Sequence, residues 1–293
     1  MGHNGMKAVI PLLLVLIVGG SACSQSVTPG PSTLPLSTEA LPAAETDSGT
    51  ILSSPIPGGI DVSIGPLSAV LPRGLAIGAS GSEFPRAEGD DVAPWDVTPG
   101  HFQLILEGYA LGDKFHQPQI LVYPAPGYAE LYPPAFESIR RLDNILFDPD
   151  GVNNQEPLPT VPFFNAAQVF ASNIQAVEFQ NGSGVRFLTE YAQYAAPVNN
   201  HELFYHFQGL TRDGLYYVIV ILPITVPILS DSNDPAAMIP AGGVAYPDIN
   251  DVNADWDGYY AAITTLLDAT PPESFSPAIS QLDLLIQSIH VTP

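Results

Sequence analysis

The chain carries the run Tyr216-Tyr217-Val218-Ile219-Val220-Ile221-Leu222, in which polar and apolar side chains do not alternate. A strand that keeps one face in water alternates with a period of two, whereas a strand covered on both faces is apolar throughout. We therefore expect residues 216–222 to form a central β-strand with other elements packed against both of its faces.

Further strand-like segments lie on the N-terminal side of this run. They are residues 62–71, 101–109, 115–123, 174–179, 185–192 and 202–210. The turns that join them contain Asn, Asp or Gly, which accept the backbone angles that a hairpin needs. These turns are expected at 112–113, 181–184 and 211–214. The stretch at 78–100, rich in Gly, Pro and acidic residues, predicts a surface loop.

Three segments repeat apolar residues at helical spacing. One spans about 133–147 behind Pro133-Pro134, one spans about 255–268, and the last begins at Ser276-Pro277, a good pair for the start of a helix. Strands, a helix, antiparallel strands and then helices predict an α+β fold. We expect a mostly antiparallel β-sheet with packed helices, two of them at the C-terminus.

The N-terminal segment indicates export. Lys7 precedes an apolar stretch at 8–18 that is too short to span a bilayer, and small residues lead to Cys23, the single cysteine. Gly20-Ser21-Ala22-Cys23 resembles the lipobox of bacterial lipoproteins, with Gly20 where Leu is usual. The resemblance implies a lipoprotein signal peptide over 1–22 and a lipid on Cys23. The chain would then be anchored to the outer face of the cytoplasmic membrane or to the cell surface. The alternative is an ordinary signal peptide cut near Ala22.

Composition divides the rest of the chain. Residues 23–57 are rich in Ser, Thr and Pro without an apolar period, which predicts a disordered tether. Residues 58–293 are expected to form a single α+β globular domain. The chain has 30 acidic residues against 8 basic ones and a formal net charge of −22. This charge repels DNA and RNA, so we expect no nucleic-acid partner.

Two resemblances follow from these features. The order of elements over about 62–293 is similar to the PsbP-like and LpqN-like fold of small exported and lipid-anchored proteins. The stretches FQNGSGVRFLTEYAQ (179–193) and NHELFYHFQGLT (200–211) resemble a family of uncharacterised bacterial lipoproteins. That family implies no particular activity.

The segment 201–206 contains His201-Glu202 and His206, which is close to a zinc-protease motif. That motif needs two His residues four positions apart on a helix, and here the spacing is five in a strand-like segment. In a strand, Glu202 and His206 share a side. If Glu190 lay opposite Glu202, Arg186 would lie opposite His206. We therefore consider Arg186, Glu190, Glu202 and His206 a candidate polar face for binding or acid–base chemistry. Ordinary cross-strand charge pairing is the alternative.

Two acidic stretches are candidates for calcium. In the stronger one, Asn253, Asp255 and Asp257 are spaced as at the start of an EF-hand loop, but position twelve is Thr264 instead of the required Glu. The other stretch covers 148–156 and contains Pro149. Asp and Asn also cap helices and make turns, which is the alternative role. No other cofactor is expected.

The sequence assigns no catalytic residue. With one cysteine, no Gly-x-Ser-x-Gly elbow and no glycine-rich phosphate loop, the common thiol, serine-hydrolase and nucleotide motifs are missing. The first functional hypothesis is a lipid-anchored, non-catalytic binding or accessory module whose partner is an envelope protein or a small ligand. The second is an extracellular hydrolase around Glu190, Glu202 and His206. The third is calcium-dependent surface adhesion.

Overall fold

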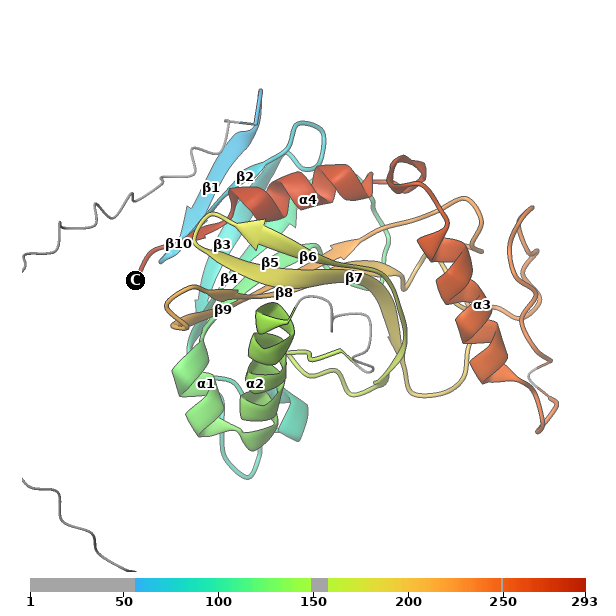
Figure 1. Ribbon diagram of the computed structural model, residues 1–293, viewed down its shortest axis with the longest axis horizontal. Helices are drawn as coiled ribbons and strands as arrows, with labels where there is room; N and C mark the ends of the chain where they lie inside the picture. Colours follow the sequence, from blue (N-terminus) through green and yellow to red (C-terminus); the bar gives the residue numbers. More distant parts are fainter. Residues whose placement is uncertain (1–55, 149–157, 249) are drawn as a thin grey trace, which may run out of the picture. The chain divides into compact units, whose positions relative to one another are not determined.

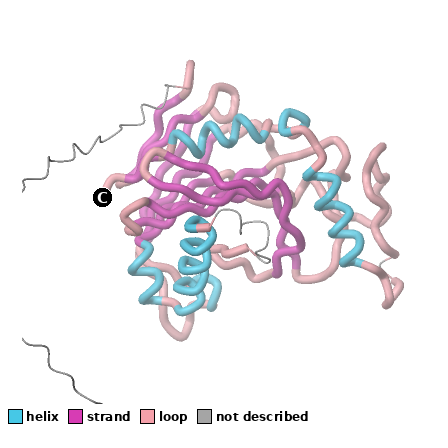
Figure 2. The backbone as a smooth tube through the Cα atoms, in the orientation of Figure 1, coloured by secondary structure: helices cyan, strands magenta, loops and turns pink. Residues whose placement is uncertain are grey.

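The computed structural model describes residues 56–148, 158–248 and 250–293. Within these ranges the chain forms a seven-stranded antiparallel sheet, in the order β3-β4-β5-β9-β8-β7-β6, and a three-stranded sheet in the order β1-β2-β10 (Figures 1 and 2). The strands are β1 (Ile60–Ile64), β2 (Leu67–Leu71), β3 (Gly78–Phe84), β4 (His101–Glu107), β5 (Gln119–Pro124), β6 (Ala167–Phe179), β7 (Gly182–Ala192), β8 (Phe204–Thr211), β9 (Tyr216–Pro223) and β10 (His290–Val291). The helices are α1 (Ala125–Leu131), α2 (Pro133–Phe147), α3 (Trp256–Asp268) and α4 (Ile279–Ser288). The α+β prediction is confirmed.

Strand β9 is the fourth of the seven strands and is buried on both faces, as its sequence predicted. Val218, Val220 and Leu222 face one hydrophobic core, which also contains side chains of β2, α3 and α4. Tyr217, Ile219 and Ile221 face a second core with side chains of α1 and α2. Figure 1 shows α1 and α2 on one side of the large sheet and α4 with the β1-β2 hairpin on the other. Each face of the strand therefore has its own cover.

Several elements differ from the sequence prediction. Helix α4 begins at Ile279 instead of at Ser276-Pro277, and β5 begins at Gln119 instead of at Phe115. The expected loop at 78–100 contains β3, whose Gly-Ala-Ser-Gly-Ser sequence has low β-propensity and whose pairing with β4 at the sheet edge leaves most of it exposed. The expected single strand at 62–71 is a hairpin of β1 and β2. Helix α1 was not predicted, because seven residues that include a Pro and a Gly give too little periodicity.

The β6-β7 hairpin turns at Gln180-Asn181, between the paired residues Phe179 and Gly182, instead of at 181–184. Gly182 and Gly184 belong to β7 itself. A Cβ atom on Gly184 would lie 2.3 Å from the carbonyl oxygen of Gln208 on β8. Glycine is therefore required at this position by the close approach of two strands.

None of the helices in the described ranges is long and apolar enough to cross a membrane.

Candidate functional site

The pairing of β7 with β8 decides which polar side chains meet. Arg186 lies opposite Phe207, and Phe187 lies opposite His206. The predicted alignment of Arg186 with His206 was wrong by one residue, and a shift of one residue moves a side chain to the other face of the sheet. Arg186 and Glu190 therefore lie on one face and His206 on the other, while Glu202 precedes β8. The four residues do not form a common polar face.

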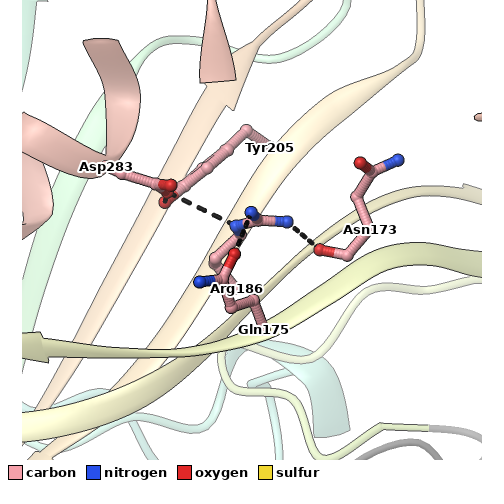
Figure 3. Close-up of polar contacts among 5 residues, drawn as sticks. All are labelled: Asn173, Gln175, Arg186, Tyr205 and Asp283. Atoms are coloured by element: carbon pink, nitrogen blue, oxygen red, sulfur yellow. Dashed lines mark hydrogen bonds and ion pairs between the residues drawn. The ribbon is translucent and has the colours of Figure 1, made fainter. Parts of the chain in front are cut away.

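Arg186 lies on the face that α4 covers (Figure 3). Its Nε is 3.4 Å from Oδ1 of Asp283 on α4, and its Nη2 donates to Oε1 of Gln175 at 2.5 Å. Its Nη1 donates to the carbonyl oxygen of Asn173. Asn173 lies at a register shift of β6 and has a positive φ of 52°, so a β-bulge turns this carbonyl toward the guanidinium.

Tyr205 completes this cluster. Its hydroxyl donates to Oδ1 of Asp283 at 2.7 Å. Burial raises the pKa of Tyr205 well above its usual value, and the negative charge of Asp283 adds to the effect, so the phenol stays a donor. Arg186 is 5% exposed, and its partners come from β6 and α4. These interactions link α4 and the bulge of β6 to the sheet. We call this group the Arg186 cluster; its members are Asn173, Gln175, Arg186, Tyr205 and Asp283.

We expect Asp283→Ala to lower the free energy of unfolding by about 2–4 kcal/mol, because it leaves the buried Arg186 charge without its counter-ion. The control is Glu137→Ala, which removes the exposed Arg140–Glu137 pair on α2 and should cost no more than about 1 kcal/mol. Urea unfolding of both variants measures the difference. Equal losses of stability would contradict a structural role for the Arg186 cluster.

Glu190 lies toward the other end of β7 from the β6-β7 turn. It is 3% exposed, and its Oε1 accepts a hydrogen bond of 2.7 Å from the backbone N–H of Asn199. Burial raises the pKa of Glu190 well above 4.5, the Asn199 hydrogen bond opposes this, and the charge of Glu202 raises it further. Through this hydrogen bond, the buried carboxyl group of Glu190 holds the backbone of the loop at 196–202 in position.

The raised pKa of Glu190 predicts a pH dependence of stability. Between pH 4.5 and the raised value the folded chain holds a proton that the unfolded chain has lost, so this group makes stability fall as pH rises. Glu190→Gln keeps an acceptor for Asn199 and cannot ionise. We expect the variant to match the wild type near pH 4 and to become more stable than it at higher pH, by up to about 1.4 kcal/mol per pH unit. Urea unfolding at several pH values measures this, and parallel stability curves would contradict it.

His206 is a core residue. Its side chain is 0% exposed, its ring stacks on Phe187 with centroids 5.1 Å apart, and Gln208 is its hydrogen-bonding partner. Burial lowers the pKa of His206 to about 3, with a smaller contribution from His116. The ring is therefore neutral at physiological pH and cannot reach a ligand from solvent.

A cavity of ≈ 350 Å³ lies where four loops meet at one end of the sheet. These loops connect β4 to β5, precede β6, separate β7 from β8, and follow β9. The residues that define its character are Phe115, His116, Phe164, Tyr191, Tyr194 and Glu202. We call this site the aromatic cavity.

The rings of the aromatic cavity pack against one another and against the buried Phe204. Phe164 and Tyr191 have centroids 4.3 Å apart, and the buried Phe204 lies 4.2 Å from His116. Phe115 is 65% exposed and Tyr194 is 69% exposed. Burial and, to a smaller extent, the nearby His201 lower the pKa of His116 to about 4, so this ring carries no charge at neutral pH. The packed rings and the two exposed rings together form an apolar surface that an organic molecule can contact.

Glu202 supplies the carboxylate of this cavity. Its Oε1 accepts from Nδ2 of Asn233 at 3.2 Å, and its Oε2 accepts from Nδ2 of Asn199 at 3.4 Å. Its backbone N–H donates to Oδ1 of Asn199 at 3.1 Å. These contacts hold the carboxylate in place through neutral amides.

Sequence reasoning found only Glu202 among these lining residues. Tyr191 lies near the end of β7 and the others lie in loops that are far apart along the chain, so no spacing in the sequence connects them. Phe115 was assigned to a strand, but it lies in the loop before β5. Aromatic residues outside the predicted strands and helices, such as Phe164 and Tyr194, were the available signal.

Two of the other cavities give less information about a ligand. A groove of ≈ 360 Å³ follows β6 beside α4 and includes Asp283, which belongs to the Arg186 cluster. A cavity of ≈ 560 Å³ is lined by Arg141 and Leu158. Leu158 is the first described residue after the gap at 149–157.

One of the proposed calcium ligands, Asp255, has a structural role at the start of α3. Asp255 caps α3, and its Oδ1 accepts from the N–H of Gly258 at 2.8 Å. The N–H of Asn253 donates to Oδ1 of Asp251 at 2.9 Å, while Asp257 lies in the first turn of α3. Among the described residues no three His, Cys, Asp or Glu side chains are grouped as metal ligands. Cys23 and nearly all of the other acidic stretch, 148–156, lie outside the described residues.

Comparison with protein-family models, with curated proteins and with solved structures found no match for this chain. The resemblances to bacterial lipoproteins and to PsbP-like and LpqN-like proteins therefore stay predictions from the sequence.

Proposed function

We propose that this protein is a non-catalytic module that binds a small organic ligand in the aromatic cavity. The module is exported and held at the outer face of the cytoplasmic membrane or at the cell surface by a lipid on Cys23. The sequence of the N-terminal segment supports the anchor, and the geometry of the cavity supports the ligand.

The observation that carries this proposal is the convergence of five rings and one fixed carboxylate on a single cavity. Ligand sites are typically concave, largely apolar and supplied with a few placed polar groups. The aromatic cavity has this composition, with Glu202 and neighbouring amides as its polar groups. Its volume of ≈ 350 Å³ is at the lower end of the range for small-molecule sites.

The positions of the titratable groups favour binding over catalysis. Acid–base catalysis needs an acid and a base that both reach the substrate. Of the three residues in the hydrolase hypothesis, only Glu202 lines the cavity, whereas Glu190 and His206 are enclosed in the protein. The calcium hypothesis rests on residues that cap α3 and shape the turn before it. The geometry therefore gives less support to either alternative.

Thermal melting of the purified chain with a library of small organic fragments tests the proposal. We expect one or more fragments to raise the melting temperature of the wild type, because a ligand that binds only the folded state stabilises it. Tyr194→Ala should weaken the binding of such a fragment about tenfold, since a ring contact contributes on the order of 1 kcal/mol.

The control is Phe136→Ala, which removes another exposed ring, on α2 and outside the cavity lining. It should leave fragment affinity unchanged. A library without a binding fragment, or binding that tolerates Tyr194→Ala, would contradict a ligand site in the aromatic cavity.

A further inference from the structure

We propose that the ligand of the aromatic cavity is a small organic cation, with an ammonium group on a compact aliphatic body. This inference rests on the proposed function and specifies the chemical class of its ligand. It follows from three properties of the cavity: its charge, the partners of its carboxylate and the chemistry of its rings.

The lining of the aromatic cavity has a negative formal charge. Among the described residues, Glu202 is the one Asp, Glu, Lys or Arg residue that lines it. His116 is neutral because its pKa is held near 4, and burial raises the pKa of Tyr191 to about 12, so neither ring changes the charge. An anionic ligand would meet the Glu202 carboxylate and the net charge of −22 without a compensating cation.

The Glu202 carboxylate has hydrogen-bond donors but no counter-ion. Its side-chain partners are the neutral amides of Asn199 and Asn233, and no salt bridge joins it to a basic side chain within the described residues. A ligand that fills the cavity displaces water from this carboxylate, which costs free energy unless the ligand supplies a positive charge. An ammonium group supplies that charge directly.

The rings favour the same ligand. The face of an aromatic ring carries negative potential and attracts a cation. Phe115, Phe164, Tyr191 and Tyr194 all contribute to the lining. A metal ion would need several oxygen ligands, whereas this cavity offers one carboxylate and mostly aromatic surface. An organic cation can form an ion pair with the carboxylate and also contact the faces of the rings. A neutral sugar would contact chiefly the rings.

Choline and its neutral isostere dimethylbutanol, in which carbon replaces the nitrogen, provide a matched pair of probes. We expect choline to bind the purified chain about tenfold more tightly than the isostere in NMR titrations. Glu202→Gln should remove most of this preference by weakening choline binding and leaving the isostere unchanged. Tyr194→Ala should weaken the binding of both probes.

The control is Glu83→Gln on β3. It removes one exposed carboxylate and changes the net charge by the same amount as Glu202→Gln, so it should leave the preference for choline intact. Equal affinity for choline and the isostere, or a preference that survives Glu202→Gln, overturns the cation inference. Absence of choline binding in a chain that binds other fragments in the aromatic cavity also overturns it and leaves the proposed function standing. Failure of all fragments together with choline overturns both.

Discussion

Strand β9 has apolar side chains on both faces, and neither face can be left in water. Val218, Val220 and Leu222 require cover on one side, while Tyr217, Ile219 and Ile221 require it on the other. A fully buried side chain of this size contributes about 1.5–3 kcal/mol relative to an exposed one. The chain meets the requirement with α1 and α2 on one face and with β2, α3 and α4 on the other, so the layered arrangement follows from this strand.

Cover on both faces also determines the environment of the polar residues that the neighbouring strands carry. Arg186 lies beneath α4 and needs Asp283, the Gln175 amide and a carbonyl from the β6 bulge. Glu190 is enclosed and protonates more readily, and His206 is enclosed and stays neutral. In contrast, Glu202 and five rings line one cavity at one end of the sheet, where a ligand can contact them.

The elements with strong periodicity could be predicted from the sequence. The central strand, the helix at Pro133–Phe147 and the helix that ends at Asp268 are found where the pattern of apolar residues placed them. The exposed edge strand β3 and the short helix α1 gave no comparable pattern. The predicted polar face failed because strand register is set by tertiary packing, and one residue of shift separated Arg186 from His206. The aromatic cavity could not be predicted, since its residues come from the end of β7 and from separate loops that only the folded sheet brings together.

The register of β7 against β8 decides which polar residues can meet, because it assigns Arg186 and His206 to opposite faces and leaves Glu202 alone among the proposed site residues at the cavity. Cross-strand nuclear Overhauser contacts between backbone protons of directly opposed residues measure it. The structure predicts contacts of Arg186 with Phe207 and of Phe187 with His206. Contacts of Arg186 with His206 instead would restore the common polar face and contradict this strand register.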